Sequence, residues 1–146
     1  MPVGAHEGDC AQDFTLMDAQ GNPHSLWDYA GEIIVVDFSG FTCRTCAKVA
    51  PEAEVFFEEN KDDLVMLTVL SKAETPEDIN SWIDQYGSTH PVLWDSDNTV
   101  TGSFDAGSMP IFLLIDRDLT ILSRGNAYEG FADVTGDAEE LLASGQ

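Results

Sequence analysis

The stretch FSGFTCRTCAKVAP, residues 38–51, contains two of the three cysteines of this 146-residue chain, Cys43 and Cys46. It follows an apolar, β-branched run at residues 33–36 and precedes a segment with helical periodicity. Two cysteines separated by two residues at the start of a helix can close a short disulfide. The unpaired N–H groups of the first helical turn favour a thiolate there. The spacing predicts a redox pair, with Cys43 as nucleophile and Cys46 as resolving thiol.

Two other interpretations of this cysteine pair are a structural zinc site and two inert core thiols. Inert thiols are expected on an apolar helix face, whereas this pair follows a strand at a loop. Zinc needs two further ligands. A non-catalytic module that holds Cu(I) between the two thiolates and a distant histidine such as His90 is a further alternative, because thiolates are soft ligands. We expect no bound metal and no cofactor. The remaining candidate ligands occur singly, without ligand spacing: Cys10, His6, His24 and His90.

The chain is strongly acidic, with 6 Lys and Arg against 27 Asp and Glu, a formal net charge of −21. A field of this sign repels phosphate, so nucleic acid and anionic membrane surfaces are expected to be poor partners, and we expect no nucleic-acid partner. The acid is interpreted as a solvating coat, with docking to a basic redox partner as the alternative. The 14 residues between Asp37 and Glu52 carry no acid, yet they include Arg44 and Lys48. We expect both cations to lower the pKa of Cys43 below its ordinary value of about 8.5.

Length and composition favour one domain over residues 1–146, expected to be monomeric. No window approaches 18 consecutive apolar residues, so no membrane span is expected. The first residues have neither the basic region nor the apolar core of a signal peptide. A leader or anchor that precedes Met1 in a longer protein remains compatible with this sequence.

Hydrophobic periodicity predicts alternating strands and helices, and hence a mixed sheet with helices on both faces. In the first half we expect a hairpin over residues 13–26, a central strand at 32–39, a strand at 64–70 and a helix at 76–86 capped by Thr75 and ended by Gly87. In the second half we expect a strand at 90–95, a loop at 95–110, strands at 111–116 and 119–125 around a two-residue turn, and a helix at 137–143.

The segment after the cysteines is expected to form an amphipathic helix, kinked at Pro51. Its apolar residues recur at helical spacing, and its acids are placed on the opposite, solvent-facing side. The apolar set is Val49, Ala53, Phe56 and Phe57, and the acidic set is Glu52, Glu54, Glu58 and Glu59.

Asp37 is an acid at the end of a buried apolar run. One interpretation is a strand-end residue already in solvent. The other is a buried carboxyl beneath the disulfide, with a pKa raised by desolvation, which exchanges a proton with Cys46 during attack or release.

These residues carry a resemblance to a known family. VVDFSGFTCRTCAKVAP, residues 35–51, resembles the thioredoxin active-site segment, with Asp37 six residues before the first cysteine and Pro51 eight after it. GSMPIFLLIDRDLTILSRG, residues 107–125, resembles the downstream segment, in which a cis-proline, here Pro110, faces the disulfide. Residues 8–31 and 77–97 are more similar to the TlpA/ResA branch of AhpC/TSA-like proteins. The resemblance spans residues 8–143.

The resemblance implies a thioredoxin fold: a mixed central sheet flanked by helices, with an N-terminal β-hairpin extension and a helical insert before the cis-proline strand. It implies catalytic roles for Cys43, Cys46, Asp37 and Pro110. It also implies that Thr42, Arg44 and the backbone of Met109 contact the substrate. Several residues depart from the family pattern and leave the direction of electron flow open: Gln12, Ser39, Thr42, the Arg44-Thr45 pair and Val49, which replaces a cavity Glu.

The implied function is thiol–disulfide exchange with partner proteins, of the cytochrome-maturation or disulfide-reduction type. A membrane-bound or soluble thiol–disulfide electron donor would be the second partner. The expected location is extracytoplasmic, with the cytoplasm as the alternative. A peroxiredoxin-like peroxidase is a rival, but it requires Thr or Ser three residues before the peroxidatic cysteine. Gly40 holds that place before Cys43, and Cys43 itself holds it before Cys46.

Overall fold

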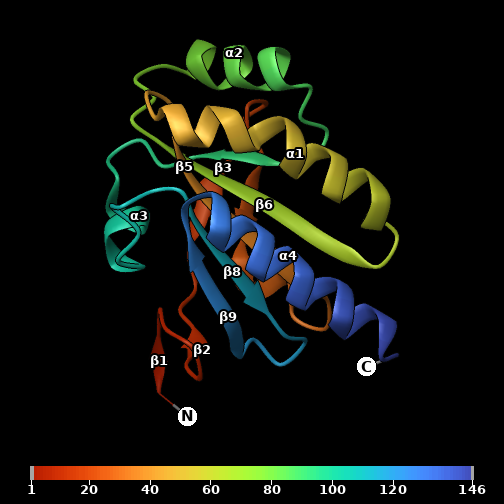
Figure 1. Cartoon of the computed structure of the whole chain (residues 1–146). Coiled ribbons are helices and arrows are strands. Elements are labelled where there is room, and N and C mark those ends of the chain that lie inside the picture. The colour runs from red at the N-terminus through yellow and green to blue at the C-terminus, as the bar shows by residue number, and fades with distance from the viewer. Residues whose placement is uncertain (1, 146) are drawn as a thin grey trace.

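The computed structural model describes residues 2–145 and contains a seven-stranded mixed sheet in the order β4-β3-β7-β6-β5-β8-β9 (Figure 1). Helices pack on this sheet, which confirms the expected α/β class. The strands of the main sheet are β3 (Thr15–Met17), β4 (Pro23–Ser25), β5 (Ile33–Gly40), β6 (Leu64–Ser71), β7 (Val92–Trp94), β8 (Ile111–Ile115) and β9 (Ile121–Asn126).

Strand β5 lies inside the sheet because its residues are apolar and β-branched, and all eight of them are buried. It pairs in parallel with β6 and antiparallel with β8. Asp37 and Ser39 interrupt the apolar run at its carboxyl end, next to the loop that carries the cysteines. The expected hairpin is also present, as the antiparallel pair β3 and β4.

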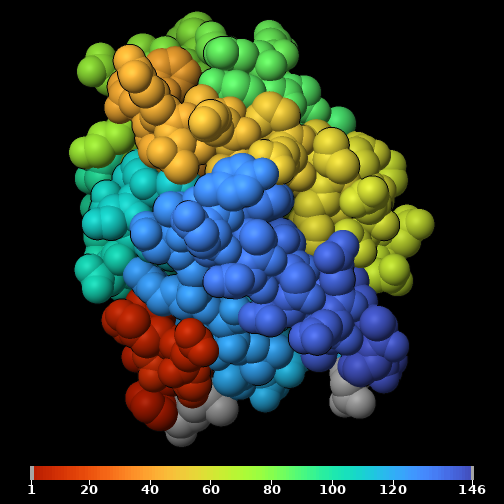
Figure 2. All heavy atoms as spheres, viewed as in Figure 1, coloured from red at the N-terminus to blue at the C-terminus, as the bar shows by residue number. Residues whose placement is uncertain are grey.

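The long helices cover one face of the sheet, and short segments cover the other. Helices α1 and α4 lie side by side across the visible face in Figures 1 and 2. The opposite face is covered by η1, the α3 region and the N-terminal segment. Within residues 2–145, no helix is both long enough and apolar enough to cross a membrane. The helices are η1 (Leu26–Tyr29), α1 (Arg44–Asn60), α2 (Pro76–Tyr86), α3 (Thr99–Ser103) and α4 (Ala127–Ala143).

Helix α2 begins and ends where its sequence signals predict. The side chain of Thr75 accepts a hydrogen bond from the backbone N–H of Asp78, and the carboxylate of Asp78 accepts one from the backbone N–H of Thr75. Gly87 ends the helix in the left-handed conformation, with φ 66°. Trp82 and Ile79 then pack against β6 and the first turns of α1, so α2 covers the cysteine end of the sheet.

Three expectations for the second half of the chain are wrong in detail. Residues 95–110 include the short helix α3 rather than loop alone. The turn between β8 and β9 is longer than two residues, because Leu119 adopts a left-handed φ of 72° and β9 starts only at Ile121. Helix α4 begins ten residues earlier than expected, at Ala127.

The early start of α4 depends on two glycines that face each other. A Cβ atom on Gly130 would overlap the backbone of Gly125 in β9, and a Cβ on Gly125 would overlap Gly130. The absence of both side chains lets the first turn of α4 lie directly against the strand. A glycine that normally weakens a helix is therefore required here by packing.

The N-terminal segment adds a small parallel pair, β1 (Val3–Gly4) with β2 (Cys10–Ala11). Arg124 of β9 ties this segment to the α3 region, because its guanidinium donates to the carbonyl oxygens of Ala5 at 2.9 Å, Phe104 at 2.8 Å and Asp105 at 2.6 Å. One of the chain's six basic side chains thus serves as a structural clamp far from the cysteine pair in sequence.

Candidate active site

The cysteine pair lies where β5 passes into α1. Cys43 and Cys46 form a disulfide. Cys43 is the N-cap of α1, and its sulfur accepts a hydrogen bond from the backbone N–H of Cys46 at 3.2 Å. Cys43 is half-buried, whereas Cys46 is only 1% exposed. Cys43 is therefore the more accessible of the two sulfurs, and the helix N-terminus favours negative charge on it.

The Met109–Pro110 segment faces this disulfide from the adjacent strand. The peptide bond between Met109 and Pro110 is cis, and the carbonyl oxygen of Met109 lies 3.9 Å from Cys43 Sγ. The sulfur of Met109 accepts a hydrogen bond from Ser71 Oγ at 3.6 Å. A Cβ on Gly40 would meet the Met109 sulfur, so a larger residue here would displace the flexible side chain of Met109. The structure thus places the Met109–Pro110 segment next to the sulfur of Cys43, although the two lie 66 residues apart in the sequence.

The side chains around the disulfide opening are exposed and include two cations. Thr42, Arg44 and Lys48 are exposed, and Met109 is half-buried. Within residues 2–145, neither Arg44 nor Lys48 takes part in an ion pair. Both charges therefore face solvent on the first two turns of α1, one and five residues after Cys43.

Asp37 is buried, with only 3% of its surface exposed. Its side chain points to the face of the sheet covered by α1, the face on which Cys46 also packs. Ser39 donates to one carboxyl oxygen at 2.7 Å, and Thr68 donates to the other at 3.1 Å. Burial raises the pKa of Asp37, and the two hydroxyls and the nearby His90 only partly oppose this effect. The interpretation of Asp37 as a solvated strand-end residue is wrong.

A buried chain of polar groups extends from Asp37 to α1. The Thr68 hydroxyl also contacts His90 Nε2 at 2.8 Å, and His90 Nδ1 lies 2.8 Å from a carboxylate oxygen of Glu54. Glu54 further accepts hydrogen bonds from the backbone N–H and the hydroxyl of Thr89, at 2.9 and 2.5 Å. His90 is 4% exposed and Glu54 is 8% exposed.

The placement of Glu54 on the solvent-facing side of α1 is therefore wrong. Glu54 lies four residues after Ala50, which lies four after Cys46, so all three share the buried face of the helix. This spacing is the signal that sequence analysis missed. His90 lies just before β7, which begins two residues later than the expected strand at 90–95, and it is buried and bonded at both ring nitrogens.

The environment of Glu54 stabilises its charged form. Burial opposes the charge, but hydrogen bonds from His90 and Thr89 outweigh it and lower the pKa of Glu54 from 4.5 to about 2. Glu54 is thus a carboxylate at neutral pH. Burial opposes the charge of both acids, but at Asp37 it outweighs the hydrogen bonds, so the pKa of Asp37 is raised and not lowered.

The histidines proposed as metal ligands have other partners. His90 uses both ring nitrogens for Thr68 and Glu54, and His24 uses both for Asp18 and Tyr29. In the described part of the chain, no three His, Cys, Asp or Glu side chains are placed to share a metal ion. These engagements argue against both the zinc and the copper interpretations.

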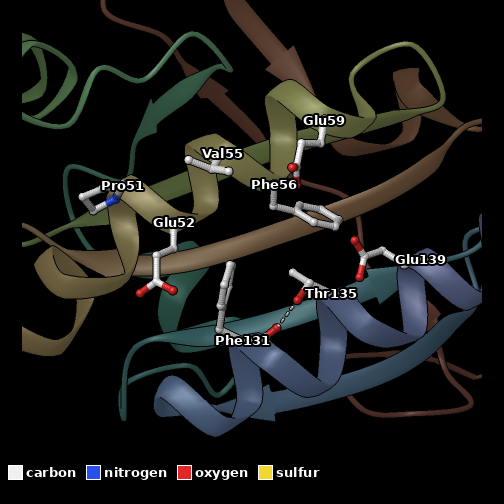
Figure 3. Close-up of a pocket in the computed structure, with 8 residues that line it drawn as sticks. All are labelled: Pro51, Glu52, Val55, Phe56, Glu59, Phe131, Thr135 and Glu139. Atoms are coloured by element: carbon white, nitrogen blue, oxygen red, sulfur yellow. Dashed lines mark hydrogen bonds between the residues drawn. The ribbon is translucent and has the colours of Figure 1, made fainter.

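A groove of about 340 Å³ lies between α1 and α4, apart from the cysteine pair. Figure 3 shows Phe56 of α1 and Phe131 of α4 beside this space, with the carboxylates of Glu52, Glu59 and Glu139 around it. The described residues that line it include no cysteine and no histidine. The groove therefore has the surfaces for an apolar contact but no redox group.

Comparison with known proteins places this geometry in context. Residues 7–124 match the AhpC/TSA family. The chain is 27% identical over 111 residues to the thiol-disulfide oxidoreductase ResA of Geobacillus kaustophilus, covering 76% of this chain and 64% of the relative. It is 27% identical over 112 residues to ResA of Bacillus subtilis, covering 77% and 63%. The matched region thus spans a little under two thirds of these curated relatives.

A solved structure shows the same fold. The thioredoxin domain of a thiol-disulfide oxidoreductase from Bacteroides vulgatus superposes with a TM-score of 0.82, at 24% identity, over 93% of this chain and 97% of that one. This similarity confirms the expected thioredoxin fold.

Proposed function

Because the chain belongs to the AhpC/TSA family, in the thioredoxin-like branch that contains ResA, we propose that it is a thiol–disulfide oxidoreductase. The observation that carries the proposal is the disulfide at the N-terminus of α1, with one half-buried and one buried sulfur, facing the cis-proline segment. Protein thiols and disulfides are the proposed substrates.

The proposed exchange proceeds through a mixed disulfide. In the reduced protein, the Cys43 thiolate attacks a partner disulfide, and one partner thiolate leaves. Cys46 then attacks the Cys43 sulfur, the second partner thiolate leaves, and the Cys43–Cys46 bond forms. Two electrons pass to the partner, and Cys46 gives up its proton. The reverse sequence oxidises a partner dithiol, and in that direction Cys46 leaves as a thiolate and takes up a proton.

Each neighbouring group is proposed to support one part of this exchange. The helix N-terminus, Arg44 and Lys48 stabilise the thiolate of Cys43. Thr42, Arg44 and the Met109 backbone contact the partner chain beside cis-Pro110. Asp37, buried under α1, exchanges the proton of Cys46. Gly40 at the position where a peroxidase would carry a hydroxyl favours disulfide exchange over peroxide reduction.

Replacement of Cys46 tests the exchange directly. In Cys46→Ser, Cys43 can still attack a partner disulfide, but nothing resolves the product, so stable mixed disulfides are expected. They can be counted by mass after incubation with a model disulfide protein and acid quenching. Cys43→Ser is the matched control and should trap none. If Cys46→Ser traps no more than this control, the proposed function is wrong.

The location and the second partner are proposed from the ResA-like family alone. We propose an extracytoplasmic site of action and a thiol–disulfide protein, membrane-bound or soluble, as the electron donor. Fractionation of the source cells with antibody detection tests the first proposal, because a protein found only in the cytosol contradicts it.

A further inference from the structure

Resting on the proposed function, we propose that Thr68, His90 and Glu54 form a buried proton relay that supplies and withdraws the proton exchanged between Asp37 and Cys46. His90 and Thr68 act through Asp37, so they are positioning residues and do not touch the sulfur atoms. The proposed function describes only the exchange of thiols and disulfides. The relay adds a defined source for the proton that this exchange requires.

The contacts form one continuous path. Asp37 Oδ2 lies 3.1 Å from Thr68 Oγ1, which lies 2.8 Å from His90 Nε2, and His90 Nδ1 lies 2.8 Å from Glu54 Oε1. Asp37 and Thr68 are register partners on β5 and β6, so the first contact is fixed by the sheet. His90 reaches Thr68 because the backbone N–H of Thr68 bonds to the carbonyl of Pro91, the residue after the histidine.

Counting hydrogen-bond donors shows how the chain stores one proton. When Asp37 is ionised, the Thr68 hydroxyl donates to it and must accept from His90 Nε2–H, while His90 Nδ1–H donates to Glu54. His90 is then an imidazolium. When Asp37 is protonated, the hydroxyl accepts from Asp37 and donates to a neutral Nε2. One proton is thus shared between Asp37 and His90.

Moving this proton leaves the buried charge unchanged. In both arrangements the three ionisable groups carry a total charge of −1, since Glu54 stays a carboxylate while the positive charge of His90 cancels that of an ionised Asp37. The transfer breaks the N–H bond at His90 Nε2 and the O–H bond of Thr68 and forms O–H bonds on Thr68 and Asp37, and the reverse transfer undoes this. When Asp37 gives the proton to the Cys46 thiolate, water in the cavity beside His90 returns one proton to the imidazole, which restores the total charge of −1. Because burying an additional net charge is costly, a transfer of this kind is favoured over direct ionisation of Asp37.

The two carboxyls are adapted to different roles. Hydrogen bonds hold the pKa of Glu54 at about 2, so this group remains the fixed anion that keeps a proton on His90 Nδ1. Burial raises the pKa of Asp37, so this group holds a proton at a higher pH than an ordinary aspartate does and can act as the exchanging acid. When the environments of two acids shift their pKa values in opposite directions, the two acids commonly take different roles in proton transfer.

Solvent reaches the far end of the relay. His90 and Thr89 line a cavity of about 290 Å³, whose walls also include Asp18 and, from α2, Ile83. Beyond Glu54, the Thr89 hydroxyl also lies 2.7 Å from a carboxyl oxygen of the exposed Glu58, and its single proton is donated to one of the two carboxylates at a time. The titratable groups around His90 are therefore Asp37 from β5, Glu54 and, through Thr89, Glu58 from α1, and Asp18 on the cavity wall.

The first arm of the test measures protonation without any substrate. Carboxyl ¹³C shifts of Asp37 and imidazole ¹⁵N shifts of His90 are followed against pH in the oxidised protein. The relay predicts that both residues respond in the same pH step, as coupled sites do. In Thr68→Val the two responses should separate, and in Thr68→Ser, which keeps the hydroxyl, they should remain joined.

The second arm measures reduction of the Cys43–Cys46 disulfide by dithiothreitol between pH 6 and 9. A positioned proton donor contributes about 10²–10⁴-fold, so losing its resupply should slow Thr68→Val about tenfold and change the shape of its pH profile. Thr68→Ser should restore the profile. The matched control is Thr101→Val, which removes another buried hydroxyl that donates at 2.7 Å to a buried carboxylate, that of Asp95.

The outcomes separate the relay from the proposed function. Independent titration of Asp37 and His90 in the wild-type protein overturns the relay, as does a Thr68→Val pH profile equal to that of Thr101→Val. If Cys46→Ser traps no mixed disulfide, the proposed function fails, and the shift titrations still decide whether the proton is shared.

Discussion

Replacing Glu54 with glutamine should destabilise the folded protein in a pH-dependent way. The variant removes the charge and keeps one amide oxygen, which can accept from His90 and from the backbone N–H of Thr89; an NH2 group replaces the second oxygen, beside the Thr89 hydroxyl. The pKa of this carboxyl is about 2 in the folded protein and 4.5 ordinarily. Because each tenfold change in an equilibrium constant corresponds to about 1.4 kcal/mol, the charge of Glu54 contributes about 3 kcal/mol at pH 7.

The direction of the pH dependence follows from the lowered pKa. A carboxyl whose folded pKa lies below its unfolded pKa stabilises the protein fully above the unfolded value. That contribution disappears as the pH falls toward the folded value. The gap between wild type and Glu54→Gln should therefore be about 3 kcal/mol at pH 6–7, begin to narrow near pH 5, fall below half near pH 3 and become small only near pH 2.

Urea unfolding followed by tryptophan fluorescence at several pH values measures this gap. Glu59→Gln, an exposed position on the same helix, is the matched control and should change stability by less than about 0.5 kcal/mol. A gap for Glu54→Gln that stays constant from pH 7 to pH 3 would refute the reasoning. It would show that the hydrogen bonds, and not the carboxylate charge, stabilise this network.

Two further predictions concern α1 and α4. The double variant Arg44→Ala, Lys48→Ala should raise the pKa of Cys43, and thiolate absorbance near 240 nm measures this in the reduced protein; an unchanged titration contradicts a role for these cations. Gly130→Ala should lower the free energy of unfolding by about 1–3 kcal/mol despite the better helix propensity of alanine, because its methyl group would overlap the backbone of β9. Gly136→Ala, with open space around it, should instead stabilise α4 by up to about 1 kcal/mol, and equal effects at both positions in urea unfolding would contradict the packing argument.

Features set by local sequence could be predicted well. Strand β5 follows from a run of apolar, β-branched residues. The start of α2 follows from Thr75 and Asp78 and its end from Gly87, and each of these residues lies within one turn of the helix end that it marks. The cysteine pair at the start of α1 is also local, since Cys43 and Cys46 lie within one turn. Pro110 was placed through its resemblance to a family pattern, because nothing in its own neighbours specifies a cis bond.

Features set by contacts between distant residues could not be predicted in the same way. Glu54 meets His90 across 36 residues of sequence, and Asp37 meets Thr68 across 31. Taken alone, each of these polar residues is typical of an exposed surface. Its burial becomes favourable only because folding brings a hydrogen-bonding side chain from a distant segment next to it. The start of α4 was missed for a similar reason, since Gly130 disfavours a helix until the strand beside it is known.

The two exposed cations beside Cys43 give the protein electrostatic forces of opposite sign at two ranges. At long range, the net charge of −21 attracts basic partners and repels acidic ones. At contact, Arg44 and Lys48 favour a carboxylate on the partner next to its reacting sulfur. Salt screens the first force over about 8–10 Å but weakens close contacts much less. Ionic strength should therefore change how quickly a partner arrives more than how well it fits, so a basic protein with an acidic residue at its disulfide satisfies both forces.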